Sequence, residues 1–271
     1  MILFVFEGPK GEVRCFDTIR ELFFPKDSST FKCVYKSNIY SLYKKLSEYD
    51  VFDGDALSHS GETVAILNEI LMKQNDTTLQ GVKEDDVSEI YLFFDYDFQD
   101  SRHTLEENNK RVSEMLDYFS DETENGKLYI NYPMVESLFY TKELPDNNYW
   151  KYCVKREDCH DKKFKRTSRE FCAYHSDNYI LLTEQEFSNE EKKRKAITRV
   201  FPNWKALITM NVEKANYIVN SLNELPEDIG TISPSEIFQN ELSKFVNIDY
   251  QVSILNSFPI FIYEYFGKGI V

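Results

Sequence analysis

Glycine and proline are scarce in this chain, which has 9 Gly and 8 Pro beside 21 Phe and 18 Tyr in 271 residues. This composition excludes collagen-like and low-complexity proteins, and it predicts regular, well-packed elements with short connections. No Gly/Ser-rich or Pro-rich linker separates two halves. Hydrophobic residues make up 42% of the chain and charged residues 29%, which predicts a globular protein rather than a disordered one.

Long apolar runs are also missing. Residues 1–6 and 258–263 form the longest runs, and each is followed by a glutamate, well short of the roughly 20 residues of a membrane helix. The first run has no basic lead-in and is too short for a secretory signal. We therefore expect a cytoplasmic protein without a membrane partner, whose cysteines do not form disulfides.

Positive charge is in deficit, because 32 Lys and Arg stand against 46 Asp and Glu, for a net charge of −14. Such a balance argues against a nucleic-acid platform over the whole surface, although a local basic groove is compatible with it. An acidic protein can also imitate nucleic acid. The charge therefore leaves both an enzyme and an acidic inhibitor open.

The first half alternates strand-like and helix-like patterns. The order β-α-β-α-β-α-β predicts a mostly parallel, Rossmann-like sheet with helices on both faces. We expect this α/β domain to cover residues 1–145 and a mainly helical C-terminal region to cover residues 146–271. The predicted strands are residues 2–6, 31–35, 89–95 and 128–130. Helices are predicted over residues 16–23, 39–48 and 62–73. Two further helices are predicted to begin at the capping box of Thr104 and Glu107 and, as a short helix, at Pro133.

Acidic side chains stand at two predicted strand ends, where parallel sheets carry their functional groups. Asp95 and Asp97 end the strand 89–95, and Glu7 follows the strand 2–6. Two aspartates at i and i+2 point the same way, and a hard cation such as Mg²⁺ relieves their repulsion. The sequence predicts a metal site here, which Asp100 could extend. The alternative is that the aspartates only mark a turn and cap a helix.

Two short segments resemble the motifs of the Toprim family. Residues 5–8 (Val-Phe-Glu-Gly) resemble its first motif, and residues 94–97 (Phe-Asp-Tyr-Asp) resemble its second. Primases, topoisomerases, recombination mediators and nucleases related to the overcoming-lysogenization-defect family share this module. The resemblance covers about residues 1–145. It implies a Toprim-like fold in which Glu7 acts in acid/base chemistry and Asp95 and Asp97 bind Mg²⁺ or Mn²⁺.

The resemblance extends to two further carboxylates. Nuclease members carry an acidic residue shortly after the glycine, and Glu12 stands one residue beyond the common spacing. Residues 131–136 resemble a proline-plus-glutamate stretch of stand-alone, defence-associated members, which implies that Glu136 is a second metal ligand. A first-turn glutamate favoured by the helix dipole is the alternative for Glu136.

Cysteine and histidine gather early in the second half, as Cys153, Cys159, His160, Cys172 and His175. Tetrahedral zinc sites use such ligands, and the best set of four is Cys153, Cys159, Cys172 and His175. The alternative is that these are unpaired thiols and solvated histidines.

The same segment is basic, since residues 151–171 contain eight Lys or Arg and four acidic residues. Interleaved aromatic residues favour contacts with phosphates and stacked bases, although a charge run can equally be a solvated face. The candidate nucleic-acid-binding residues are Lys162, Lys163, Lys165, Arg166 and Arg169.

Missing motifs narrow the function further. The chain has no GxxxxGK[ST] phosphate loop and no nucleophile elbow, and it is too short for a primase with its accessory domains. We expect a Mg²⁺-dependent endonuclease of the Toprim type that cuts RNA or DNA. The resemblance implies a bacterial antiphage defence effector, held inactive by a regulatory protein partner or by homo-oligomerisation. The alternative is a non-catalytic Toprim-like or acidic protein that binds or inhibits a nucleic-acid-processing partner.

Overall fold

The computed structural model describes residues 1–271 except 27, 50, 53–61 and 173–176. Its centre is a five-stranded sheet of order β2-β1-β3-β5-β4. Four strands are parallel, and the short β4 runs antiparallel to β5. A mostly parallel α/β sheet is therefore confirmed. The strands are β1 (Ile2–Phe6), β2 (Thr30–Val34), β3 (Glu89–Asp95), β4 (Ser120–Asp121) and β5 (Gly126–Asn131).

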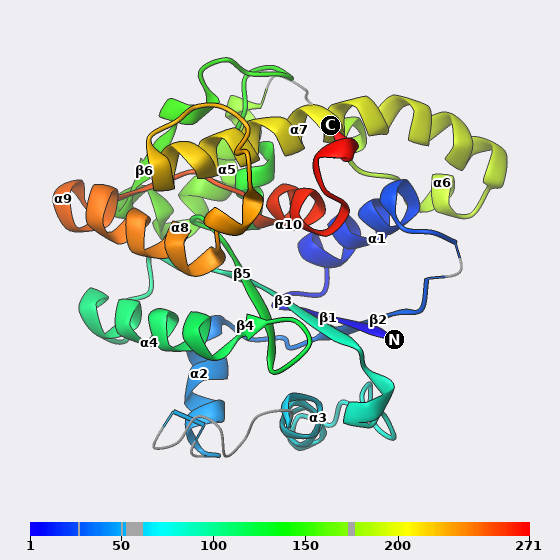
Figure 1. The fold of residues 1–271 in the computed structure, drawn as a ribbon, viewed down its shortest axis with the longest axis vertical. Helices are drawn as coiled ribbons and strands as arrows, with labels where there is room; N and C mark the ends of the chain where they lie inside the picture. The colour runs from blue at the N-terminus through cyan, green and yellow to red at the C-terminus, as the bar shows by residue number, and fades with distance from the viewer. Residues whose placement is uncertain (27, 50, 53–61, 173–176) are drawn as a thin grey trace.

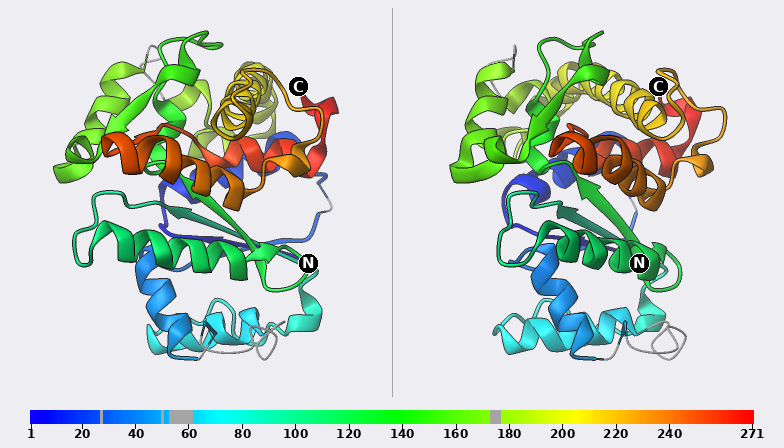
Figure 2. Two further views of the ribbon diagram at one scale, coloured as in Figure 1. Left: turned by 60° about the vertical axis from the view of Figure 1, so that its left-hand side comes forward. Right: turned by 90° about the vertical axis from the view of Figure 1, so that its left-hand side faces the viewer.

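Helices cover both faces of the sheet, as Figure 1 shows. One face carries α2 (Ile39–Ser47), α3 (Thr63–Lys73) and α4 (Leu105–Tyr118). The other face carries α1 (Gly11–Phe23) and α10 (Ser257–Phe266). The 31-residue helix α7 (Glu190–Asn220) packs against α10 and adds an outer layer (Figure 2).

The second half is mainly helical, as predicted. Besides α7 and α10 it contains α5 (Lys163–Phe171), α6 (Glu184–Phe187), α8 (Pro234–Glu241) and α9 (Asn247–Asp249). Two short strands, β6 (Cys153–Lys155) and β7 (Gln251–Ser253), form a separate antiparallel pair. No helix within the described ranges is long and apolar enough to cross a membrane.

Aromatic side chains bind α10 to the sheet. The rings of Phe93 in β3 and Phe258 in α10 are stacked, with centroids 4.5 Å apart and planes inclined by 4°. Phe261 meets Phe4 of β1 edge-on at 5.7 Å. These side chains are fully or almost fully buried, and each such large ring contributes a few kcal/mol of hydrophobic free energy. The extreme C-terminal part of the chain is therefore part of the core around the N-terminal strands.

One local prediction is right only in part. A short helix follows Pro133, but it is a 3-10 helix that begins two residues later, at Val135 (Val135–Phe139), with Met134 as its N-cap. Tyr132 forms an isolated antiparallel bridge with Leu255, which holds the backbone before this helix in the extended form. The capping box of Thr104 and Glu107 is confirmed at the start of α4.

Candidate functional site

The carboxyl ends of β1 and β3 lie side by side, because Phe6 pairs with Phe93 in parallel register. Glu7 therefore emerges beside Asp95. One carboxylate oxygen of Glu7, Oε2, accepts a hydrogen bond from the backbone N–H of Asp95 at 3.0 Å. The structure thus brings these two predicted site residues into direct contact.

Asp95 is buried at the end of β3. Its Oδ1 atom accepts hydrogen bonds from the backbone N–H of Val135 at 2.8 Å and from the Asn131 side chain at 3.2 Å. Asn131 is itself held by Ser257, whose N–H and hydroxyl both donate to Asn131 Oδ1. A relay from α10 through β5 therefore orients the carboxylate of Asp95.

Asp97 stands where the chain turns away from the sheet, with a left-handed backbone of φ +49° that aspartate tolerates better than most residues. Its Oδ2 atom accepts a hydrogen bond from Asn38 at 2.9 Å, and its Oδ1 atom accepts one from Gln99 at 2.8 Å. Asn38 also caps the N-terminus of α2. The second aspartate is therefore fixed by the element that follows β2.

Glu12 and Glu136 approach the same region from two other elements. Glu12 lies in the first turn of α1, and its carboxylate covers Gly8, where an added Cβ would come within 3.2 Å of Oε2. Glu136 pairs with Lys165 of α5 at 2.9 Å. The second oxygen of Glu136 is buried and has no hydrogen-bond partner within the described part of the chain.

Burial and mutual repulsion act together on these carboxyl groups. Burial, followed by the charge of Asp97, raises the pKa of Glu7 to about 9. The pKa of Asp95 is raised well above its usual value, first by burial and then by the charges of Glu7, Glu12 and Glu136. Burial also raises the pKa of Glu12 and of Asp97. A cluster of this kind is short of positive charge.

Lys165 supplies positive charge to this cluster. Burial disfavours its ammonium form, but the carboxylates of Glu136, Asp95 and Glu12 outweigh that effect and raise the pKa of Lys165. Even with this lysine present, the pKa values of Glu7 and Asp95 stay high. The cluster therefore has the charge to accept a further cation.

The predicted residue Asp100 and its neighbour His103 contribute less. Asp100 pairs with Arg102 at 2.6 Å, so its charge is already compensated. His103 is exposed at the end of the same loop. Across the described residues, no three Asp, Glu, His or Cys side chains are already gathered as closely as metal ligands require. Metal binding by Glu7, Asp95, Asp97, Glu12, Asp100 or Glu136 therefore stays a prediction.

Comparison of the chain with family models, curated proteins and solved structures finds no match. The Toprim resemblance therefore stays a prediction that rests on the two short motifs. The observed strand order is compatible with the coarser class of a Rossmann-like fold.

The predicted zinc ligands divide into described and undescribed residues. Cys153, Cys159 and Cys172 form no disulfide within the described part of the chain, and Cys159 and Cys172 are buried. Burial raises the pKa of Cys159 to about 12, which disfavours the thiolate that zinc binds. His175 lies outside the described residues. Zinc binding is an untested prediction.

The predicted basic residues lie on and beside α5, close to the carboxylates. Lys163 forms an ion pair with Asp158, and Lys165 forms one with Glu136. Lys162, Arg166 and Arg169 are exposed. A basic helix therefore borders the acidic cluster.

Three residues that shape the site, Asn38, Asn131 and Arg156, were not predicted as site residues from the sequence. Arg156 donates to the carbonyl oxygens of Phe98 at 2.8 Å and Asp100 at 2.7 Å, and so ties down the loop after β3. Asn38 and Asn131 follow or end strands of the same sheet edge. Their position at strand ends could have identified the two asparagines as site residues. No neighbouring residue in the sequence indicates a role for Arg156.

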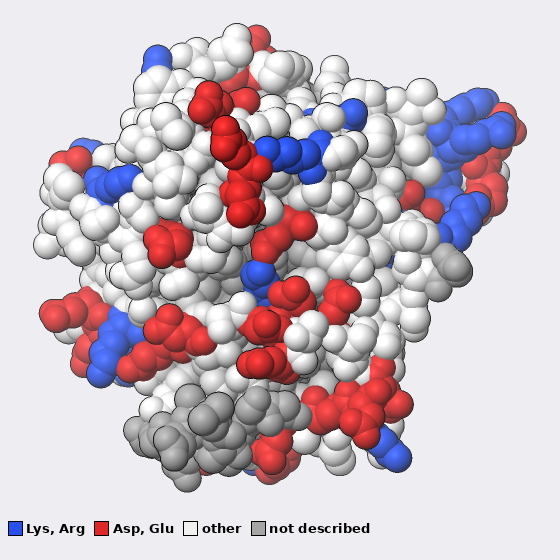
Figure 3. Space-filling model, viewed as in Figure 1, with Lys and Arg blue, Asp and Glu red and all other residues white. Residues whose placement is uncertain are grey.

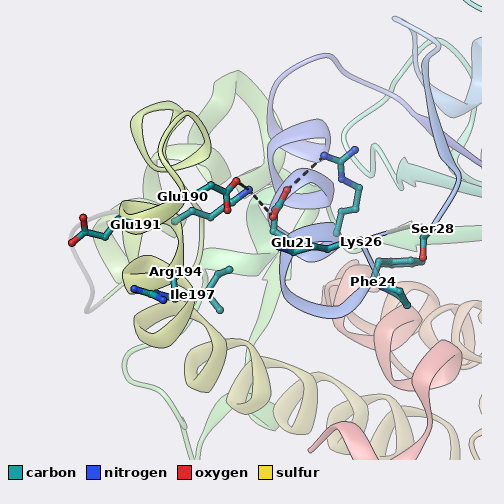
Figure 4. A pocket seen from close by; sticks show the side chains of 11 residues that line it. Glu21, Phe24, Lys26, Ser28, Glu190, Glu191, Arg194 and Ile197 are labelled. Atoms are coloured by element: carbon teal, nitrogen blue, oxygen red, sulfur yellow. Dashed lines mark ion pairs between the residues drawn. The ribbon is translucent and has the colours of Figure 1, made fainter.

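Away from the candidate site, acidic and basic side chains are mixed over the surface. On the face seen in Figure 3, acidic side chains are widely spread, and Lys and Arg gather over the N-terminal end of α7. A cavity of about 740 Å³ lies between the end of α1 and the start of α7. There Glu21 meets Arg20 at 3.8 Å and Lys193 at 3.2 Å, as the dashed lines in Figure 4 mark. Opposite charges alternate in this cavity, so it favours neither anions nor cations.

Proposed function

We propose that this protein is a divalent-metal-dependent nuclease that hydrolyses phosphodiester bonds of RNA or DNA. The observation that supports the proposal best is the partly compensated cluster of Glu7, Glu12, Asp95, Asp97 and Glu136 at the carboxyl edge of a parallel sheet. Carboxylate oxygens are the ligands that Mg²⁺ and Mn²⁺ prefer.

The oxygen donors of this cluster are of the chemical type that a hard divalent cation binds. Asp95, Asp97 and Glu136 would hold it, and the free oxygen of Glu136 is one acceptor without a partner in the described chain. When bound, such a cation supplies Lewis-acid stabilisation of the negative charge that develops at a phosphate under attack. Cation binding would also lower the repulsion that now raises the pKa of Asp95.

Glu7 has the properties of a proton-transfer group. Its pKa of about 9 means that it holds a proton at neutral pH when no cation is present. The bond from the Asp95 N–H orients its carboxyl group at the strand end. A carboxyl group with a pKa near or above neutrality can exchange a proton with a reacting water or leaving group.

The basic residues of helix α5 favour the binding of a polyanionic substrate. Lys162, Arg166 and Arg169 are exposed on or next to this helix, and Lys165 joins the helix directly to Glu136. Phosphate contacts by Lys and Arg position a nucleic acid without reading its sequence. A defence role and control by a protein partner or oligomer remain part of this proposal through the Toprim resemblance.

Cleavage assays with matched variants test the proposal. Purified protein is incubated with tRNA, single-stranded DNA and duplex DNA, in Mg²⁺, in Mn²⁺ or in EDTA. We expect metal-dependent cleavage that falls about 100-fold or more in Glu7→Gln and in Asp95→Asn. Asp117→Asn is the matched control, because Asp117 is exposed on α4.

Two further measurements separate loss of function from loss of fold. Asp95→Asn should unfold in EDTA at a temperature equal to or above that of the wild type, because it removes a buried, repelled charge. Its affinity for Mn²⁺ should be at least about tenfold weaker. A wild-type protein that cuts none of the substrates and binds no Mn²⁺ would instead support the non-catalytic acidic protein.

A further inference from the structure

A second pocket lies beside the candidate site, between α2 and α4. Its volume is about 480 Å³, a size that accommodates a small ligand. Its wall is formed by Tyr40, Ser41, Tyr43, Lys44, Ser47, Arg102, His103 and Arg111. Nothing in the proposed cleavage chemistry uses this pocket.

The charged residues that line this pocket are all basic, although the protein as a whole is acidic. The lining includes Lys44, Arg102, Arg111 and His103, and none of the eight lining residues is acidic. The whole chain has a net charge of −14, so a wall with only basic charges stands out against its surface. Such a wall attracts anions.

Two of these cations are available to a ligand. Lys44 and Arg111 form no ion pair with any residue in the described part of the chain, whereas Arg102 pairs with Asp100. The guanidinium of Arg111 rests 5.5 Å from the centroid of the Tyr43 ring, which restricts its motion without neutralising it.

The carboxylates around the pocket are engaged elsewhere. Glu107 accepts hydrogen bonds from Thr104 in the capping box of α4. Glu114 accepts the Tyr43 hydroxyl at 2.7 Å and lies 3.7 Å from Lys110. Hydrogen bonds from Thr104, and then the charge of Arg111, lower the pKa of Glu107, and Lys45, followed by Lys44, lowers the pKa of Glu48. These carboxylates act on Arg111 and Lys44 only at a distance, so both basic side chains keep their hydrogen-bond donors for a ligand.

The pocket is also tied to the DxD loop. Arg102 and His103 belong to the segment that follows Asp97, and the Tyr40 hydroxyl donates to the carbonyl oxygen of Tyr96 at 2.9 Å. Asn38, one turn before Ser41, holds Asp97. A ligand in the pocket would therefore lie next to the proposed cleavage centre.

We propose that the pocket between α2 and α4 binds a phosphate group carried by a nucleotide or by a nucleic-acid strand. Arginine binds phosphate through two parallel hydrogen bonds, and lysine binds it as a compact charge. The assignment of a phosphate follows from the pocket alone. The choice of a strand as its source rests on the proposed nuclease function, since a strand crossing the carboxylates would present neighbouring phosphates on this side.

Binding measurements in EDTA test this inference independently of cleavage. The probes are inorganic phosphate, adenosine monophosphate, and a single-stranded oligonucleotide with a 5′-phosphate, titrated by calorimetry into the full chain. The variants are Lys44→Gln, alone and combined with Arg111→Gln. Lys110→Gln is the matched control, because Lys110 lies on α4 with its side chain 77% exposed and does not line the pocket.

We expect at least one probe to bind the wild type about tenfold or more tightly than the double variant, with Lys44→Gln intermediate and Lys110→Gln unchanged. Loss of affinity for the monophosphate identifies a free nucleotide as the ligand, and loss confined to the oligonucleotide identifies a strand. The inference is overturned if no probe binds the wild type, or if both pocket variants bind as tightly as the wild type. Failure of the nuclease proposal alone leaves this binding intact, because it needs neither metal nor Asp95.

Discussion

At the scale of single residues, the protein buries ionisable groups outside the carboxylate cluster as well. Lys214 and Glu241, inside the second half, are both fully buried. Lys214 donates to the carbonyl oxygens of Tyr149 at 3.0 Å and Tyr152 at 2.7 Å, and Glu241 accepts the N–H of Ser253 at 2.9 Å. Burial lowers the pKa of Lys214 to about 7 and raises that of Glu241 to about 8.

These pKa values predict how stability depends on pH. The pKa of Glu241 is higher in the folded state than the ordinary 4.5, so its contribution to stability is complete below about pH 4.5 and is lost as pH rises through about 8. The depressed pKa of Lys214 acts in the opposite sense, and its unfavourable contribution is relieved only between about pH 7 and 10.5. The window from pH 5 to 7 therefore reports mainly on Glu241.

We expect the wild type to lose about 2 kcal/mol of unfolding free energy relative to Glu241→Gln between pH 5 and pH 7. Urea unfolding of both proteins at the two pH values measures this difference, and contributions from the carboxylate cluster cancel because both proteins contain it. Glu236→Gln, an exposed change on the same helix, is the control. A difference between wild type and Glu241→Gln that does not change with pH would contradict the prediction.

At the scale of elements, segments of the second half position the two loops that carry the candidate site. Arg156, which follows β6, holds the loop after β3, and its guanidinium lies 6.0 Å from the centroid of the Phe98 ring. At the start of α10, Asn256 donates to the carbonyl oxygen of Val135, and Ser257 holds Asn131. The site therefore depends on elements far away in the sequence.

Replacing Arg156 should loosen the loop after β3. In Arg156→Ala, amide hydrogen exchange of residues 96–103 should be at least about tenfold faster, because two charge-assisted hydrogen bonds are lost. Exchange in α4 should stay unchanged. Hydrogen-exchange mass spectrometry measures both regions, with Arg166→Ala on the exposed side of α5 as the control. Equal protection of the loop in wild type and Arg156→Ala would show that other contacts hold it.

At the scale of the whole molecule, the sheet is covered on one face by a helix from the other end of the chain. Phe258 and Phe261 of α10 pack on the rings of β1 and β3, and α7 packs on α10 from outside. The division into residues 1–145 and 146–271 is an untested prediction. These contacts favour one folding unit, in which the N-terminal residues alone would expose a large apolar surface.

A fragment of residues 1–145 should therefore fail to fold on its own. Loss of α10 uncovers the rings of Phe4 and Phe93, and truncating even one buried phenylalanine costs about 3–5 kcal/mol, a large part of the stability of a typical domain. Circular dichroism and NMR of the fragment, compared with the full chain, measure the outcome. A fragment with dispersed NMR signals and a cooperative unfolding transition would contradict this prediction and support an autonomous domain.

Local patterns in the sequence were enough to predict the main elements. The continuous apolar run of residues 2–6 and the largely apolar segment 89–95 predicted the two central strands. Thr104 with Glu107 predicted the start of α4, because capping depends on neighbouring residues. The position of Glu7 and Asp95 at strand ends follows from the same patterns. The contact between Glu7 and Asp95 follows from the pairing of β1 with β3, and the β-α-β alternation suggests a parallel sheet of this kind.

Tertiary structure alone decided the rest. Lys165 faces Glu136, Asn131 is held by Ser257, and Tyr132 pairs with Leu255 just before the short helix that begins at Val135. These partners are tens to more than a hundred residues apart, and no local pattern encodes which distant segments meet. The sequence determined that acidic groups end the strands. Only the packing of the second half against them decided how far those groups are buried, and therefore how strongly their pKa values shift.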